Sequence, residues 1–586
     1  MKMRDSYSIY LFFLGTAIVL MFQFMVLRYD VLLRFDANLS LISYAIRSFA
    51  DTLILLLPFW LFPARFRSFI WIVIIVFTCW TISQMWYFRT YNDLMPFSSY
   101  LLFNNISSLL LNCIVGSIRI IDCFLIIPVI ILFILYWRYF KLPIKRIKIT
   151  TKEKVVYICT IFLISSVIYI AQAFIYYQHE KGKTVSVFWG RYTNAGGYAF
   201  YLNYNGFVPF CIHSAIETAL EKQELTKTEK EQINRYICSK QQKPACLYNT
   251  SEKKNLILII VESLNSWVLD FRINDIEVTP NLNKYCKAEN SLTALRMFPQ
   301  VKDGRSSDAH FMYNTGLLPI KYGAVAVRYG KANYPSMAKA LKEYHSLEIV
   351  CDDAKFWNQN NTFVSYGFNE IFDCHTISHN SDDKVSDQAM FTKAFEVLKN
   401  TPQPFYAQLV TITMHQPYNE LVVPMTNISR SSQYTKEIRN YLEATHFCDA
   451  AIGEFIHKLK ETGIYQNSVI AIIADHNELN KNVLDGRDEV KTSDKEIPLI
   501  ILNGPQALQY KEVLGQIDVY PTLLDVMNIN TYSWPGLGYS ILRKPAPTSA
   551  VSWSGELAGD GKLEIISRQK EAWSISNTII TKHFFK

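Results

Sequence analysis

Two parts of the chain differ in how apolar residues are distributed. The first part holds long, nearly uncharged runs, and five of them predict membrane-spanning helices at 8–27, 42–62, 69–88, 120–137 and 155–177. The first run is too long for the apolar core of a signal peptide, and no small-residue cleavage site follows it, so we interpret it as a retained span. After residue 254 the apolar runs become short, which is typical of a water-soluble domain.

Short apolar runs in the second part predict the strands of a mostly parallel sheet. They lie at 256–261, 347–350, 405–411, 468–473 and 498–502, and helical patterns occur at 334–344, 387–398 and 434–462. This alternation predicts helices on both faces of the sheet. The expected fold class is therefore multi-domain, with a five-helix transmembrane domain at 1–177, a helical juxtamembrane connector at 178–253 and an α/β domain at 254–586. In the connector, Thr228 and Glu231 predict a helix-capping box.

Charge placement predicts the orientation of the membrane part. The net charge of the 586-residue chain is +8, but the basic residues cluster at 138–154, between two predicted spans. A cytoplasmic loop explains this cluster better than a nucleic-acid patch, so we expect no nucleic-acid partner. The basic residues at 2–4 and 65–67 fall on the same side, and an odd number of spans then places 254–586 outside the cytoplasm.

Several polar residues near the membrane part add weaker expectations. Arg47 and Asp51 are one helical turn apart within the second span, which favours a structural pair over a substrate contact. Segment 104–117 is too polar to span and predicts an amphipathic helix at the outer interface. An oxidising compartment would permit disulfides between cysteines that are close in sequence, at 238 and 246 or at 351 and 374.

Metal-binding residue types follow two of the predicted strands. Glu262 comes directly after 256–261, and Asp475 and His476 follow 468–473. Ligands of open α/β sheets bind beyond the carboxyl ends of the strands, so we expect these three side chains to meet there. Carboxylate oxygens and a neutral imidazole suit Zn²⁺ or Mn²⁺. Taken alone, Glu262 is more often a helix cap, so the prediction depends on the second strand.

Six segments, taken in order, resemble the lipoteichoic acid synthase branch of the alkaline phosphatase and sulfatase superfamily. They are NLILIIVESLNSW (255–267), GRSSDAHF (304–311), FWNQNNTFVSYGFNEIFD (356–373), TMHQPY (413–418), ADHNEL (474–479) and IDVYPTLLDVM (517–527). The membrane half also resembles that family, with YFRTYNDLMPF (87–97) after the third span. Each motif is a weak signal by itself, but their order and spacing are specific.

The resemblance implies a set of site residues. The implied metal ligands are Glu262, Ser306, Asp475 and His476, with Mn²⁺ or Zn²⁺ as the ion and Mg²⁺ also compatible. Ser306 stands where the family has a nucleophilic threonine, and Ser307 is the alternative if the register shifts by one residue. Arg305 beside it would neutralise charge on a phosphoryl group.

Four further residues match the part of the family site that holds the transferred headgroup. Asp352, Trp357 and His415 correspond in type, whereas Gln359 stands where the family has an arginine. Loss of that fixed charge predicts an altered substrate. For Trp357 a core aromatic position, and for His415 a surface loop position, are the structural alternatives.

The activity implied by the resemblance is transfer of a phospho-headgroup from a membrane phospholipid to a glycan or lipid acceptor of the cell envelope. Glycerol phosphate is the favoured headgroup, phosphoethanolamine the alternative, and water a third acceptor. Localisation would be the bacterial cytoplasmic membrane, with the catalytic domain extracytoplasmic. Sulfate ester hydrolysis is disfavoured because segment 304–308 lacks the proline and downstream arginine of a sulfatase site. A catalytically silent binding protein on the same fold is the non-enzymatic alternative.

Overall fold

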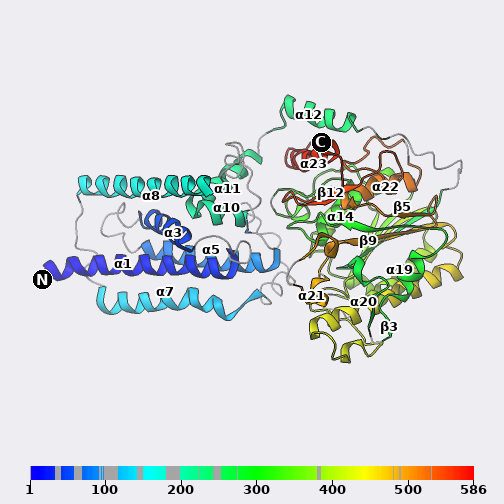
Figure 1. The fold of residues 1–586 in the computed structure, drawn as a ribbon, viewed down its shortest axis with the longest axis horizontal. Coiled ribbons are helices and arrows are strands. Elements are labelled where there is room, and N and C mark those ends of the chain that lie inside the picture. The colour runs from blue at the N-terminus through cyan, green and yellow to red at the C-terminus, as the bar shows by residue number, and fades with distance from the viewer. Residues whose placement is uncertain are drawn as a thin grey trace. The chain divides into compact units, whose positions relative to one another are not determined.

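The computed structural model describes most of the chain in two compact units, Met1–Glu221 and Lys222–Lys586 (Figure 1). The described residues are 2–32, 41–57, 69–91, 94–95, 97, 100, 117–140, 150–179, 198–221, 224–240, 242 and 253–585 without 274, 322, 379–383, 480, 488–489 and 530. Each unit is described by itself.

The N-terminal unit is built of helices. They are α1 (Lys2–Leu27) with its continuation η1 (Arg28–Leu32), α3 (Leu41–Leu55), α5 (Ile70–Tyr91), α7 (Cys123–Leu135) with η6 (Tyr136–Phe140), α8 (Thr151–His179), α10 (Tyr198–Asn205) and α11 (Phe207–Glu221). Among the described residues, four segments are long and apolar enough to cross a membrane: Leu11–Leu32, Ile70–Arg89, Ile120–Arg138 and Thr151–Gln172. The second predicted span corresponds to α3, which has 15 described residues, and the end of that span lies outside the described part. Each of the five predicted spans therefore contains a helix.

Two charged residues predicted to pair within α3 also have other partners in the N-terminal unit. Arg47 Nη1 donates a hydrogen bond to the side-chain oxygen of Gln172 at 3.3 Å. The Asp51 carboxylate accepts a hydrogen bond from the hydroxyl of Tyr169 at 2.6 Å and one from the backbone N–H of Phe207 at 2.8 Å. Both charges are buried, and these contacts give them a structural role. The helix predicted at 104–117 lies outside the described residues, except for its last residue.

A nine-stranded sheet forms the centre of the C-terminal unit. Its order is β10 (Leu508–Tyr510), β4 (Ser291–Phe298), β9 (Ile497–Leu502), β8 (Ser468–Ala474), β1 (Asn255–Val261), β7 (Phe405–Val410), β5 (His345–Val350) and β6 (Glu370–Phe372), with β11 (Leu514–Gly515) also pairing with β4. All seven residues of β1 and of β8 are buried, as expected for strands covered on both faces. The predicted mostly parallel sheet is confirmed, but β9 runs antiparallel to β4 and β8.

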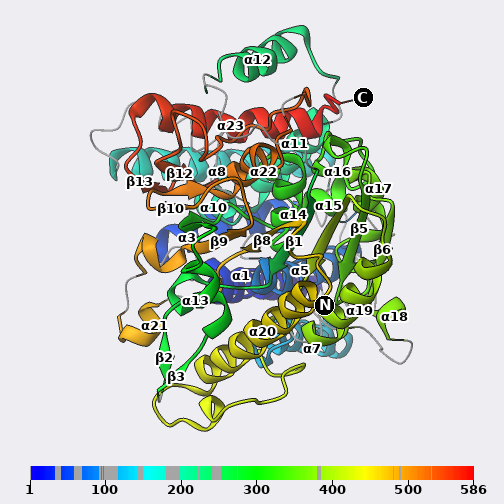
Figure 2. The same cartoon turned by 90° about the vertical axis from the view of Figure 1, so that its right-hand side faces the viewer.

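Helices cover both faces of this sheet (Figure 2). On one face lie α13 (Pro280–Cys286), α19 (Asp387–Asn400) and α20 (Lys436–Glu461), and on the other lie α14 (Ser306–Thr315), α22 (Val519–Val526) and α23 (Leu563–Thr581). Shorter helices are α15 (Val325–Arg328), α16 (Met337–Ala340), α17 (Gln359–Tyr366), α18 (Cys374–Ile377) and α21 (Asn482–Asp485). Two small antiparallel pairs, β2 (Arg272–Ile273) with β3 (Ile276–Glu277) and β12 (Ser549–Val551) with β13 (Leu557–Gly559), complete the unit.

Several local predictions were wrong. The helix expected over 334–344 is reduced to the four residues of α16. The capping box of α12 (Lys227–Cys238) is formed by Thr226 and Glu229, two residues earlier than predicted, because the helix begins earlier. Cys351 and Cys374 are both buried and form no disulfide with each other. The other suggested pair, 238 with 246, includes a residue outside the described part.

Candidate active site at the carboxyl edge of the sheet

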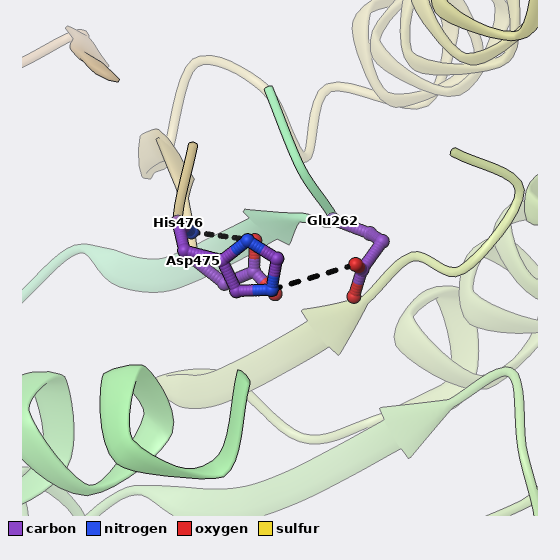
Figure 3. Close-up of side chains that lie close together, drawn as sticks. All are labelled: Glu262, Asp475 and His476. Atoms are coloured by element: carbon purple, nitrogen blue, oxygen red, sulfur yellow. Dashed lines mark hydrogen bonds and ion pairs between the residues drawn. The ribbon is translucent and has the colours of Figure 1, made fainter. Parts of the chain in front are cut away.

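Neighbouring strands bring three of the predicted metal ligands together. β1 and β8 pair in parallel with Val261 opposite Ala474, so the next residue of each strand leaves the sheet at the same level. Glu262 from the end of β1 and the Asp475–His476 pair from the end of β8 point toward one another (Figure 3). Nε2 of His476 lies 3.6 Å from Oε1 of Glu262 and 3.5 Å from Oδ2 of Asp475.

Hydrogen bonds with the backbone and with the Ser263 hydroxyl orient these three side chains. Nδ1 of His476 lies 3.1 Å from the carbonyl oxygen of Asn477, so Nδ1 carries the hydrogen and Nε2 keeps a free lone pair. Oδ1 of Asp475 accepts hydrogen bonds from the backbone N–H groups of Ser263 at 2.8 Å and of His476 at 2.6 Å, which leaves Oδ2 for the cluster. The hydroxyl of Ser263 donates to Oε1 of Glu262 at 2.7 Å. Each ligand atom therefore has a fixed direction.

Burial shifts the protonation of all three groups. Burial lowers the pKa of His476 to about 4, and the positive charge of Arg305 acts in the same direction. The imidazole is therefore neutral at pH 7, as a metal ligand must be. Burial raises the pKa of Glu262, and the nearby Asp475 raises it further. Burial also raises the pKa of Asp475. Two carboxylates held this close repel each other, and a divalent cation would relieve that repulsion.

Ser306 supplies a fourth oxygen to the cluster. It is the first residue of α14, and its Oγ lies 3.2 Å from Oε2 of Glu262 and 3.4 Å from Nε2 of His476. A tetrahedral ion bound at about 2.1 Å holds its donor atoms about 3.4 Å apart. The distances from Nε2 of His476 to Oε1 of Glu262, to Oδ2 of Asp475 and to Oγ of Ser306 are close to this spacing, so these side chains could hold one Zn²⁺-sized or Mn²⁺-sized ion.

Ser307 is arranged differently from Ser306. Its side chain is buried, and its hydroxyl donates a hydrogen bond to the carbonyl oxygen of Gly304 at 2.7 Å. That hydroxyl closes the turn before α14. The geometry thus favours Ser306 over Ser307 as the residue that faces the cluster.

The turn before α14 is shaped by a buried acid. Oδ2 of Asp308 accepts hydrogen bonds from the backbone N–H groups of Lys302 and Gly304, both at 2.9 Å. A Cβ atom at position 304 would lie 2.2 Å from Oδ1 of Asp308, so this position requires glycine. Arg305 follows with φ of 46°, a strained value for a residue with a side chain. This backbone conformation puts Ser306 at the first position of α14, beside the ends of β1 and β8.

Arg305 is held at the edge of the cluster by Glu478. Its guanidinium donates a hydrogen bond from Nη2 to Oε2 of Glu478. Burial lowers the pKa of Arg305, but Glu478, Glu262 and Asp475 outweigh that effect, and the pKa is raised. Arg305 therefore stays positively charged and interacts electrostatically with the candidate metal ligands Glu262 and Asp475.

The four predicted headgroup residues lie beyond β5 and β7. Asp352 follows β5, and burial raises its pKa to about 7, an effect to which Glu262 adds. His415 follows β7 and is exposed, with Nδ1 at 2.9 Å from the carbonyl oxygen of Gln416, so Nε2 is its open nitrogen. Trp357 is half-buried, and the centroid of its ring lies 5.4 Å from the centroid of the Phe356 ring.

Gln359 is almost completely enclosed. It is 3% exposed at the start of α17, and its Oε1 has no hydrogen-bond partner among the described residues. A buried acceptor without a partner is costly, unless a ligand supplies the missing donor. Gln359 is the first residue of α17, which follows Asn358 with φ of 57°.

Comparison with known proteins finds a family model that matches the part of the chain that carries this site. Residues 254–529 match the sulfatase family model. The part of the chain that contains this match is called the sulfatase domain below. The chain is 27% identical over 379 residues to Lipoteichoic acid synthase 1 of Bacillus subtilis (strain 168), covering 61% of this chain and 59% of that protein. It is 26% identical over 376 residues to Lipoteichoic acid synthase of Staphylococcus aureus (strain USA300), covering 60% and 58%.

A solved structure has the same fold as the sulfatase domain. The crystal structure of the lipoteichoic acid synthase LtaP from Listeria monocytogenes matches with a TM-score of 0.50 and 22% identity, covering 60% of this chain and 98% of that one. The chain is therefore lipoteichoic acid synthase-like and is homologous to sulfatase-family enzymes. It covers 59% and 58% of the lengths of the two relatives named above.

Three residues of the sulfatase domain support the cluster and were not predicted from the sequence. Glu478 holds Arg305, and it lies inside the ADHNEL motif, two residues after His476, where it could have been noticed. Gln516 donates from Nε2 to the backbone oxygen of Asp475 at 2.6 Å and to the hydroxyl of Tyr313 at 2.7 Å. Tyr313 gives no signal in the sequence, because it looks like any other core residue of α14.

Proposed function

We propose that this protein is a metal-dependent phosphotransferase that moves a phospho-headgroup from a membrane phospholipid, through a phospho-serine on Ser306, to a cell-envelope acceptor. The observation that carries the proposal is the convergence of Glu262, Asp475 and His476 on the hydroxyl of Ser306, the first residue of α14. A protein that only binds a ligand would not need the Ser306 hydroxyl beside the candidate metal ligands. It would also not need the strained turn at Arg305 that positions this hydroxyl.

In the first step Oγ of Ser306 attacks phosphorus, and the bond from phosphorus to the diacylglycerol oxygen breaks. The hydroxyl donates to Oε2 of Glu262 at 3.2 Å, and the proton that it loses on attack passes through solvent to the diacylglycerol oxygen that leaves. A divalent cation, when bound to the four donors, supplies positive charge that stabilises the serine alkoxide. The N-terminus of α14 and Arg305 add positive potential where the phosphoryl oxygens would lie.

In the second step an acceptor hydroxyl attacks the same phosphorus, and the bond from phosphorus to Ser306 breaks. We assign His415 to bind or protonate an oxygen of the headgroup or leaving group, because its Nε2 is open and the residue is exposed at the same sheet edge. Asp352, Trp357 and Gln359 are assigned to the headgroup. The domain boundaries at 177 and 253 and an extracytoplasmic location of the catalytic domain belong to the same proposal.

Glycerol phosphate from phosphatidylglycerol is the headgroup we favour. The relatives carry the name lipoteichoic acid synthase, and the neutral amide of Gln359 needs a hydrogen-bond donor that a glycerol hydroxyl provides. Phosphoethanolamine is the alternative, since its ammonium group is also a donor. Sulfate ester hydrolysis is disfavoured, because the segment around Ser306 lacks the sulfatase proline and arginine.

The test uses purified full-length protein with fluorescent phosphatidylglycerol and phosphatidylethanolamine in separate reactions. We expect release of fluorescent diacylglycerol, faster from phosphatidylglycerol, and a mass increase on the Ser306 peptide equal to one glycerol phosphate. Release of free glycerol phosphate in the absence of any acceptor would show transfer to water. No diacylglycerol from either lipid, with divalent metal bound, would contradict the proposed activity.

A further inference from the structure

The loop between β7 and α20 exposes an apolar tip. Within residues 421–436, here called the 421–436 loop, Val423 is 67% exposed and Met425 is 56% exposed, and Pro424 between them is also exposed. Single exposed apolar residues are ordinary, but three in a row at a loop end are unfavourable in water unless they have a partner.

Buried contacts hold this tip in place. Oε1 of Glu443, a buried residue of α20, accepts hydrogen bonds from the backbone N–H groups of Met425 at 2.9 Å and Thr426 at 3.0 Å. Oε2 of the same carboxylate accepts a hydrogen bond from the Thr426 hydroxyl at 2.9 Å. Ile428, three residues after Met425, is fully buried. The fold therefore presents the apolar side chains outward on an anchored backbone.

The tip begins next to the candidate active site. Glu420, directly before the loop, forms an ion pair with Lys384, and Lys384 pairs through a β-bridge with Asp352. His415 lies six residues before Leu421. Whatever the tip contacts is thus brought close to the carboxyl edge of the sheet.

The charge of the loop matches an anionic surface. Residues 421–436 contain the basic residues Arg430 and Lys436, both exposed, and no aspartate or glutamate. An exposed acid, Glu437, follows the loop, and its Oε1 accepts a hydrogen bond from Gln416 at 3.4 Å. Exposed apolar side chains and basic residues within one short segment are typical of segments that lie in the headgroup region of a bilayer.

We propose that the 421–436 loop docks on the anionic lipid surface of the membrane, with Val423, Pro424 and Met425 among the headgroups. The same chain carries four segments long enough to cross a membrane, so the polypeptide itself would tether the sulfatase domain to the bilayer and a small apolar contact suffices. A protein partner fits less well, because stable protein interfaces bury about 1,200–2,000 Å² and the tip has three apolar residues. The inference does not depend on the proposed chemistry.

The test is photo-crosslinking in full-length protein reconstituted in nanodiscs of phosphatidylcholine and phosphatidylglycerol with a fluorescent lipid tracer. The photoreactive residue p-benzoylphenylalanine replaces Val423 in one variant and Leu563 in the matched control. Leu563 is 87% exposed and starts α23, which lies on the opposite face of the sheet from α20 (Figure 2). We expect about tenfold more fluorescent lipid adduct at position 423 than at 563. Equal lipid adducts at both positions, or an adduct to a second protein at position 423, would overturn the proposal.

A second arm tests the charge. In the variant with the photoreactive residue at 423, the lipid adduct should increase about fivefold as phosphatidylglycerol replaces phosphatidylcholine. Adding Arg430→Gln and Lys436→Gln should remove that increase. An increase that survives both substitutions would overturn the electrostatic part. Neither arm measures catalysis, so failure here and failure of the phosphotransferase proposal are distinguishable.

Discussion

The two halves of the candidate active site are built differently. At the ends of β1 and β8, the side chains of Glu262, Asp475 and His476 are each held by a hydrogen bond with a neighbour, and Nε2 of His476 lies within 3.6 Å of an oxygen of each acid. At the ends of β5 and β7, Gln359 keeps an unpartnered oxygen and His415 is exposed. The first half is complete without a substrate, whereas the second half has hydrogen-bonding capacity left for one.

From this difference we expect that some residues determine the rate of the reaction with every lipid and that others determine which lipid is preferred. Changes in the metal half should abolish catalysis for every lipid, because they remove the nucleophile or the charge that activates it. Changes in the headgroup half should alter the ratio between lipids and leave the chemistry in place. The predictions below test this division, beginning with the largest expected effect.

The largest effect is expected for Ser306→Ala. Diacylglycerol release from phosphatidylglycerol should fall by about 10³-fold or more, because the attacking oxygen is gone. Ser307→Ala is the matched control, since it removes an adjacent hydroxyl that closes the turn onto Gly304, and we expect a loss below about tenfold. The readouts are the rate of diacylglycerol release and the mass of the peptide covering residue 306. The opposite pattern would reassign the nucleophile to Ser307.

The second effect concerns metal affinity. His476→Ala removes the Nε2 donor and should weaken divalent metal binding by about 100-fold or more. His457→Ala serves as control, because that histidine is exposed on α20 with 70% of its side chain accessible. Metal content of the full-length protein, measured by mass spectrometry after dialysis against a weak chelator, checks the expectation. Unchanged metal content in His476→Ala would mean that the metal does not bind at the ends of β1 and β8.

The third effect concerns lipid choice. Gln359→Leu keeps the approximate size but removes the buried acceptor, and kcat/KM for phosphatidylglycerol should fall by roughly 30-fold. Gln359→Glu adds a negative charge and should shift preference toward phosphatidylethanolamine by about tenfold, since its headgroup is cationic. Gln388→Leu, at an exposed glutamine of α19, is the control. If Gln359→Glu lowered kcat/KM equally for both lipids, residue 359 would not discriminate between the two headgroups.

Much of the metal half could be predicted from the sequence because its signals are local. A run of six apolar residues that stops at Glu262, and another that stops at Asp475, indicate both the strands and their functional ends. The choice between Ser306 and Ser307 could not be made, since it depends on which hydroxyl reaches the Gly304 carbonyl. The direction of β9 was equally hidden, because a buried apolar run has the same composition in parallel and antiparallel strands.

The headgroup half was harder to predict for a physical reason. Gln359 lies in the segment Asn358–Gln359–Asn360–Asn361, whose composition is typical of an exposed loop. Its burial results from tertiary packing of α17 and not from its neighbours in the sequence. β4 was missed for a related reason, since Arg296 interrupts its apolar pattern at a position that is exposed in the folded strand.

The smallest effect on catalysis is expected beneath the headgroup half, at Glu348 of β5. Burial raises the pKa of this carboxyl to about 8, and its Oε1 accepts a hydrogen bond from Gln408 at 2.7 Å. The folded state therefore keeps a proton between about pH 4.5 and 8 that the unfolded chain loses, so the free energy of unfolding falls as pH rises through this window. Glu348→Gln is neutral at every pH and should lose this dependence, gaining about 4 kcal/mol over wild type between pH 5 and pH 9.

Melting temperatures of the full-length protein in detergent from pH 5 to pH 9 check this expectation, with Glu396→Gln, an exposed residue of α19, as control. Diacylglycerol release by Glu348→Gln at pH 7 should stay within about threefold of wild type, because the residue lies inside the sheet and supports the headgroup half only through Gln408 and the backbone of β5. Parallel melting curves of Glu348→Gln and wild type across the pH range would contradict a protonated Glu348. A large loss of activity with unchanged stability would instead tie this buried acid to the reaction, and the division between the two halves would no longer hold.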